Sequence, residues 1–220
     1  MSLTQATLLN MYTAMLDRLG PSHWWPGRTP FEVCVGAILT QNTNWNNVEK
    51  AIENLRFKEL LDPVSLFQID RDYLSELIRP AGYYRIKADR LRNFLNFLRE
   101  NTGFRLKRLQ EEGTSELREK LLRVKGIGAE TADSILLYAL HKPSFVVDNY
   151  TARILGRHDM VRQNIGYEEL RALFMDNLPK DIYIYQEFHA LLVRLGNKWC
   201  RKKYGLCSDC PLSFLPSTGL

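Results

Sequence analysis

The chain has 220 residues, 45% of them hydrophobic and 25% charged, a composition that is typical of folded globular proteins and excludes disordered chains. No apolar run reaches the roughly 20 residues of a membrane-spanning helix, and the first residues lack the basic-then-apolar order of a signal peptide. We therefore expect a cytoplasmic protein that binds no membrane. The formal net charge of +5 permits binding to a polyanion without requiring it.

Apolar residues recur at helical spacing through most of the chain, which predicts an all-α protein. The segment 20–30 interrupts this pattern with three prolines, two glycines and the pair Trp24-Trp25, and is typical of a loop. Residues 144–147 are a short extended piece, and no alternating run is long enough for a sheet. The expected helices cover residues 3–19, 31–55 in two stretches joined near 42–44, 63–67, 70–78, 86–101, 115–124, 129–140, 149–155, 167–177 and 184–199.

Two glycines separated by one residue, Gly126 and Gly128, stand between two expected helices. Glycine adopts positive φ and lets another backbone approach closely, and the unpaired amides at the start of a helix attract anions. The turn is therefore a candidate phosphate site. A tight turn between two core helices explains the same pattern equally well.

Asp148 follows the apolar residues 145–147 and precedes an expected helix. For an isolated aspartate in this position, the first interpretation is a helix N-cap. Here the glycine hairpin lies about twenty residues upstream, and the combination resembles the signature of the endonuclease III, or helix-hairpin-helix-GPD, superfamily of DNA glycosylases. In that family the hairpin holds backbone phosphates and this aspartate is catalytic.

Further segments resemble the family in its own sequence order, so the resemblance covers nearly the whole chain. These segments are 31–43, which is similar to the family's early helix that ends in a DNA-inserting Gln, 82–88, and 189–196. The resemblance implies two helical domains with a DNA groove between them. One is a six-helix barrel of residues 27–136, which includes a helix-hairpin-helix at about 115–136, and the other is built from residues 1–26 and 137–220.

The resemblance also implies contacts with double-stranded DNA that contains damaged bases, made by a monomeric protein associated with the nucleoid. The candidate DNA-binding residues are Gln41, Asn42, Lys125, Gly126, Ile127, Gly128 and Thr131. Gln41 or Asn42 would fill the gap left by a flipped base, although a polar helix end is the alternative for both. Further cations that either contact phosphate or are solvated are Arg85, Lys87, Arg90 and Arg123.

Bifunctional members of the family attack the sugar with a lysine two residues after the second hairpin glycine, where this chain has Glu130. A carboxylate cannot form the Schiff base that this strand cleavage requires, and Lys125 is not at the matching position. We therefore expect a monofunctional glycosylase in which Asp148 stabilises the sugar cation and orients water. The alternatives are a bifunctional endonuclease III-type glycosylase and AP lyase acting on oxidised pyrimidines, and a non-catalytic DNA-binding protein with the same hairpin.

A tryptophan-rich loop followed by Thr-Gln-Asn-Thr and another tryptophan is similar to the endonuclease III-like 3-methyladenine DNA glycosylases. In those enzymes this constellation forms the pocket for the flipped base, and indole stacks well on a cationic alkylated purine. We therefore expect an alkylated purine as substrate. The candidate base-pocket residues are Trp24, Trp25, Pro26, Trp45 and Glu130, for which burial in the core or a first-turn helix acid is the alternative.

Cys200, Cys207 and Cys210 reproduce three of the four ligand positions of the iron–sulfur cluster that the resemblance implies. The fourth position is Pro216, which offers no ligand, and Cys34 lies in an apolar helix as a small buried hydrophobe. Clustered thiolates are typical of metal sites. An iron–sulfur cluster, either a four-iron (4Fe-4S) cluster with a non-cysteine fourth ligand or a three-iron cluster, is favoured over no metal, and zinc remains open; the expected chemistry needs no cofactor.

Overall fold

The computed structural model describes residues 2–22 and 24–217, and within these ranges the chain is all-α, with no β-strand. The all-α fold class predicted from the sequence is confirmed. The chain divides into two compact units: a terminal unit of Met1–Trp24 with Pro143–Leu220, and a central unit of Trp25–Lys142. Among the described helices, none is long and apolar enough to cross a membrane.

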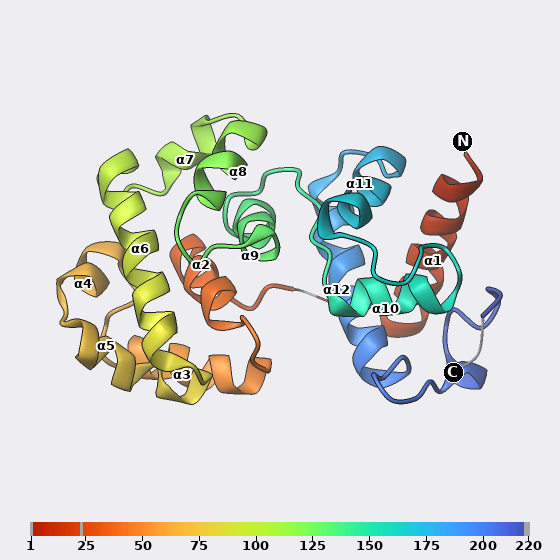
Figure 1. Ribbon diagram of the computed structural model, residues 1–220, viewed down its shortest axis with the longest axis horizontal. Coiled ribbons are helices and arrows are strands. Elements are labelled where there is room, and N and C mark those ends of the chain that lie inside the picture. The colour runs from red at the N-terminus through yellow and green to blue at the C-terminus, as the bar shows by residue number, and fades with distance from the viewer. Residues whose placement is uncertain (1, 23, 218–220) are drawn as a thin grey trace. The chain divides into compact units, whose positions relative to one another are not determined.

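The central unit contains the helices coloured from orange to green in Figure 1. In chain order its elements are α2 (Pro30–Leu39), α3 (Trp45–Phe57), α4 (Pro63–Gln68), α5 (Arg71–Leu77), the 3-10 turn η1 (Arg79–Ala81), α6 (Tyr84–Thr102), α7 (Lys107–Glu111), α8 (Thr114–Leu122), α9 (Ala129–Ser134) and the π turn η2 (Ile135–Ala139). Several helices start at a side chain that accepts a first-turn N–H, which stabilises the helix end. These N-cap residues are Thr29, Asn44, Asp62 and Asp70.

Helix α2 forms the centre of this unit. Every residue from Phe31 to Leu39 is buried, and α2 packs against α3, α6, α9 and η2. A helix that is apolar on all sides must be covered on all sides. This explains why its sequence lacks the amphipathic pattern of the neighbouring helices.

Lys87 is a buried structural residue of α6, and its prediction as a phosphate contact or solvated side chain is wrong. Its side chain is 1% exposed, and Nζ donates hydrogen bonds of 2.8 Å to the carbonyl oxygens of Leu39 and Ala81. Burial, together with the nearby Arg90, lowers the pKa of Lys87 to about 8. Lys87 therefore ties the ends of α2 and η1 together, since both carbonyls lie where a helix leaves its last acceptors without an N–H partner.

The terminal unit combines the first helix with the last third of the chain. Its elements are α1 (Leu3–Leu19), α10 (Asn149–Arg157), α11 (Tyr167–Asn177), α12 (Ile182–Lys198) and the 3-10 turn η3 (Cys207–Asp209). Helices α1, in red, and α12, in blue, lie side by side (Figure 1). The rings of Phe145 and Phe174 stack at 4.1 Å, and Phe188 packs edge-on against both. These aromatic contacts join the segment before α10 to α11 and α12.

The segment that follows α1 is fixed to α12 by charged side chains. Arg194 donates to the carbonyl oxygens of Leu19 and Gly20 and to the hydroxyl of Ser22, at 2.6 to 2.9 Å. The buried carboxylate of Glu187 accepts the N–H of Ser22 at 2.8 Å. These bonds satisfy backbone groups that a loop would otherwise leave to water.

The predicted and observed helices differ mainly in how they end. The expected single helix 129–140 is α9 followed by the π turn, in which the N–H of Leu140 reaches the carbonyl of Ile135. A π turn adds a residue to the helical repeat without changing the apolar pattern, so the periodicity does not reveal it. The elements α7, η1 and η3 were not predicted because each is too short to give a periodic signal.

The two helices beside the glycine hairpin are joined by a buried ion pair. Arg118 on α8 donates to both carboxylate oxygens of Asp133 on α9, at 2.8 and 3.0 Å. The side chain of Arg118 is 15% exposed and that of Asp133 is 0% exposed. A planar guanidinium held by both oxygens fixes orientation as well as distance, so the pair sets how α8 and α9 meet at the hairpin.

Replacing Arg118 with alanine should lower the free energy of unfolding by about 3–5 kcal/mol, because a buried carboxylate loses its guanidinium partner. Urea denaturation followed by circular dichroism measures the effect. Arg123→Ala is the matched control, since Arg123 lies 3.8 Å from Glu119 with both side chains more than 70% exposed and its loss should change little. Equal effects for the two variants would contradict this role of the ion pair.

Candidate functional site

The glycine hairpin joins α8 to α9 and has one position that requires glycine. Gly126 has φ +95°, and a Cβ there would collide with the side chain of Arg90. Gly128 differs, because it has φ −89° and a Cβ would meet no other atom within 4 Å. Packing against Arg90 therefore explains why residue 126 is a glycine. The backbone of Gly128 is open to the approach of a ligand. Between them Ile127 is buried, whereas Lys125 is exposed.

Gln41 is bonded to the hairpin. Its Nε2 donates to the carbonyl of Gly126 at 3.0 Å and to the hydroxyl of Thr131 at 2.8 Å, while Oε1 accepts from Arg90. The structure thus brings three of the predicted DNA-binding residues together. Asn42, the next residue, is exposed and has φ +54°, which asparagine tolerates better than most residues. Of the two wedge candidates, Asn42 is the one whose side chain is exposed.

Three aromatic side chains of the central unit form a cluster: Trp25, Trp45 and Tyr138, here called the aromatic cluster. The ring of Trp25 lies 5.3 Å from that of Trp45, edge to face, and 5.4 Å from that of Tyr138. Both tryptophans are partly exposed, and Tyr138 is 5% exposed. Sequence analysis missed Tyr138 because its only signal was one tyrosine inside an apolar helix.

The other predicted base-pocket residues lie outside this cluster. Pro26 and Glu130 are exposed, with Glu130 in the first turn of α9. Trp24 is partly exposed and belongs to the terminal unit. The structure therefore brings together Trp25 and Trp45 of the predicted five, and adds Tyr138.

Asp148 is the N-cap of α10, and its two carboxylate oxygens have different partners. Oδ1 accepts hydrogen bonds from the N–H of Thr151 at 2.8 Å and from its hydroxyl at 2.9 Å. Oδ2 lies 3.7 Å from Nε2 of His189 on α12, with exposed fractions of 12% for Asp148 and 8% for His189. The capping role and a functional role are therefore compatible, since Oδ1 carries the cap and Oδ2 faces an imidazole.

The surroundings of Asp148 favour its ionised form. Burial raises the pKa of its carboxyl group, but His189 and the two hydrogen bonds from Thr151 lower it by more, and the pKa lies below its ordinary value. A buried carboxylate that stays charged at neutral pH is suited to stabilising a cation or orienting water. His189 was missed as its partner, although it begins the segment 189–196 that resembles the family.

The three clustered cysteines border one small cavity of the terminal unit, of about 70 Å³. Cys200 follows α12, and Cys207 and Cys210 lie at the two ends of η3. Over the described residues, no three His, Cys, Asp or Glu side chains stand arranged to hold a metal ion. Because the expected fourth position is Pro216, the donors do not fit an all-cysteine four-iron cluster, and Cys34 is buried in α2.

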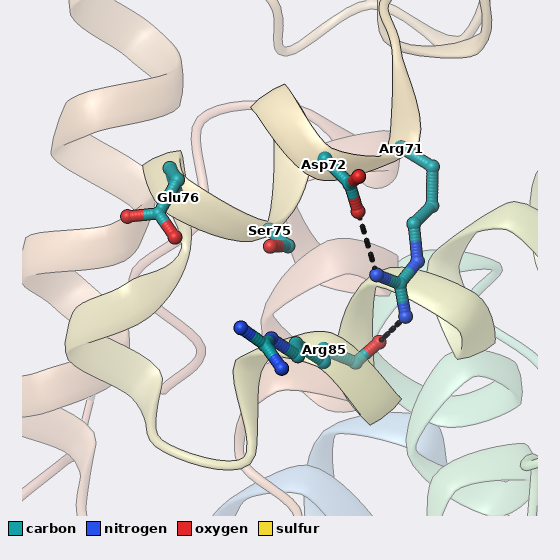
Figure 2. Close-up of a pocket in the computed structure, with 5 residues that line it drawn as sticks. All are labelled: Arg71, Asp72, Ser75, Glu76 and Arg85. Carbon is teal, nitrogen blue, oxygen red and sulfur yellow. Dashed lines mark hydrogen bonds and ion pairs between the residues drawn. The ribbon is translucent and has the colours of Figure 1, made fainter.

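A second hollow, of about 480 Å³, lies between α5 and the start of α6 (Figure 2). Arg71 crosses it, donating to Asp72 at 2.7 Å and to the carbonyl of Arg85 at 3.2 Å. Arginine and carboxylate side chains line it together, and no residue predicted for catalysis or for the base pocket is among them. Of the described residues, no aromatic side chain lines this hollow, and the carboxylate of Asp72 is already paired with the guanidinium of Arg71.

Comparison with known proteins places these features in one family. Residues 35–180 match the model of the HhH-GPD superfamily base excision DNA repair proteins. A Methanocaldococcus jannaschii protein named "Putative DNA repair glycosylase" is 49% identical over 206 residues, 93% of each chain. Endonuclease III of Thermotoga maritima is 31% identical and the match covers 82% of this chain and 79% of that one.

A structural comparison also finds a DNA glycosylase. The 3-methyladenine DNA glycosylase of H. pylori, determined with 1,N6-ethenoadenine bound, superimposes with a TM-score of 0.75 at 29% identity, and the match covers 89% of this chain and 97% of that chain. The family match spans the hairpin, the aromatic cluster apart from Trp25, and Asp148. The chain therefore belongs to the HhH-GPD superfamily of base excision DNA repair glycosylases.

Proposed function

We propose that this protein is a monofunctional DNA glycosylase that hydrolyses the N-glycosidic bond of an alkylated purine, with Asp148 as its catalytic carboxylate. The observation that carries the proposal is the environment of Asp148. Its carboxyl group is almost completely buried and yet favoured as the anion by Thr151 and His189. A structural N-cap needs only the partner in the first turn of its helix, whereas a group that stabilises a developing cation needs its charge.

The chemistry follows from the bond that breaks. As the purine leaves with the electrons of the glycosidic bond, the sugar becomes an oxocarbenium-like cation that a nearby carboxylate stabilises. Water then attacks the sugar carbon, and Asp148 orients it and accepts its proton. His189 acts as a positioning residue, because it holds Oδ2 while Thr151 holds Oδ1.

The aromatic cluster supports an alkylated purine as substrate. Alkylation at a ring nitrogen gives the base a positive charge, which weakens the glycosidic bond and strengthens stacking on indole. Trp25 and Trp45 are partly exposed aromatic rings of the kind that hold a flipped base. The likeness to a 3-methyladenine DNA glycosylase at 29% identity points the same way.

The hairpin provides the proposed grip on the DNA backbone. The open backbone at Gly128 and the exposed Lys125 are available to a phosphate. The exposed Asn42 is the proposed wedge, and Gln41 is the residue that holds the hairpin in place. Water is the proposed nucleophile, because Glu130 replaces the lysine that lyases of this family use.

Asp148→Asn should reduce base release by about 10²–10⁴-fold, the usual contribution of acid–base catalysis, and leave DNA binding intact. Asparagine still caps a helix, so α10 should remain folded. The assay follows single-turnover release of 3-methyladenine from duplex DNA. The matched control is Asp181→Asn, which changes the capping aspartate of α12 and should keep full activity. Undiminished release by the Asp148 variant would sink the proposal.

His189→Gln should move the acid limb of the activity profile to higher pH. The interaction with His189 lowers the pKa of the Asp148 carboxyl group, so the loss of the imidazole raises that pKa. Protonated Asp148 cannot stabilise a cation, and activity is then lost earlier as the pH falls. Measuring kcat/KM against pH separates this shift from a uniform loss of activity, which would indicate a merely structural role.

The lesion and the absence of lyase activity can be tested together. We expect the protein to release 3-methyladenine and 7-methylguanine faster than uracil, hypoxanthine or thymine glycol, and the DNA strand to break only after alkali. Borohydride should trap no covalent adduct, because trapping needs a Schiff base. A trapped adduct that disappears in Lys125→Ala would establish the bifunctional alternative, which the 31% identity to an endonuclease III makes worth testing.

A further inference from the structure

The cavity beside the three clustered cysteines contains one more side chain that commonly binds metal. His158, at the C-terminal end of α10, lines it together with Cys200, Cys207 and Cys210. Three thiols and an imidazole are a familiar ligand set for a closed, tetrahedral structural zinc site. Sequence analysis did not consider His158, because it lies more than forty residues before the first of these cysteines.

The imidazole of His158 is oriented as ligating histidines usually are. Its Nδ1 lies 2.8 Å from the carbonyl oxygen of Pro216. A carbonyl only accepts hydrogen bonds, so Nδ1 is the donor in this contact and Nε2 is the nitrogen left for a metal. Metal-binding histidines typically donate their other ring N–H to a carbonyl or carboxylate in this manner. The contact also brings His158 to Pro216, the position at which a fourth cysteine is missing.

Two of the thiols already have donors suited to a thiolate. Arg157 donates to Sγ of Cys200 at 3.1 Å, and the N–H of Leu212 points to Sγ of Cys210 at 3.5 Å. Hydrogen bonds from a cation and from backbone amides stabilise negative sulfur. They are the outer contacts that a metal-bound thiolate requires.

We propose that Cys200, Cys207, Cys210 and His158 form a Cys₃His site for a single zinc ion. The cavity of about 70 Å³ has room for an ion or a few waters. Among the described residues no three of these side chains already stand close enough to hold a metal ion, so the proposal requires the ligands to converge when the metal binds, as they do in many metal-dependent folds. Cys207 lies on an exposed segment, so moving it inward disturbs little packing.

Hydrogen bonds fix the backbone at the start of the cysteine segment, residues 199–206, close to α10. The side chain of Arg153 donates to the carbonyl of Cys200 at 2.8 Å, and the N–H of Leu206 donates to the carbonyl of Trp199 at 2.9 Å. Arg157 also donates to the carbonyl of Arg201 at 2.8 Å. These bonds hold the start of the cysteine segment against the end of α10, where His158 lies.

The test uses the full-length protein and measures metal binding instead of base release. Protein purified without chelator should contain one zinc per chain by mass spectrometry of the metals. Cobalt added to the metal-free protein should give the visible absorption of a tetrahedral thiolate-bound ion. His158→Ala should weaken zinc binding more than about 100-fold, beyond the 10–100-fold effect of losing an outer contact. Ser213→Ala, which changes another residue of the cavity wall, should bind zinc normally.

A second variant covers the case in which His158→Ala fails to fold. His158→Cys replaces one zinc ligand with another and should retain zinc and a cobalt spectrum shifted toward four thiolates. The proposal is overturned if the wild-type protein binds no zinc or cobalt, if it holds an iron–sulfur cluster instead, or if His158→Ala binds zinc as tightly as the wild type. None of these results depends on the glycosylase activity.

Discussion

The charge of one carboxyl group, that of Asp148, is the constraint on which the proposed chemistry depends. A nearly buried carboxylate is unstable unless its surroundings favour the anion, and here three features do so: the start of α10, the hydroxyl of Thr151 and the imidazole of His189. The segment just before it, with Phe145 stacked on Phe174, fixes where the chain delivers this group. Helix capping and the proposed catalysis therefore depend on the same arrangement.

In the central unit, the glycine hairpin likewise depends on a few side chains that contact one another. Gly126 is required because Arg90 packs where a side chain would be, and Arg90 in turn holds Gln41, which bonds to the carbonyl of Gly126. The buried pair of Arg118 with a carboxylate of α9 fixes the helices on both sides. Gln41, a predicted DNA-binding residue, thus helps to fix the hairpin turn. The exposed backbone at Gly128 is open to a ligand.

Sequence analysis predicted the features that periodicity and local order encode, and missed those that depend on packing between distant segments. The helical class, Gly126 and Asp148 each have a signature within a few residues. Tyr138 lies in an unforeseen π turn, more than a hundred residues from the Trp25 ring that it contacts, and His189 lies about forty residues from the aspartate that it faces. Lys87 resembled a surface cation, because one of the two carbonyls that bind it, that of Leu39, comes from a segment that is adjacent only in the fold.

Helix α10 connects the proposed chemistry to the proposed metal site. Its N-terminal end is capped by Asp148 and its C-terminal end by His158, about 15 Å apart at 1.5 Å per residue. The helix dipole favours an anion at the first end, where Asp148 lies. A metal bound by His158 and the three cysteines would tie the C-terminal end of α10 to the segment that follows α12, and would in this way stabilise the helix that presents Asp148 without taking part in bond cleavage. Loss of the metal should then appear first as lower stability of α10, and only through it as slower catalysis.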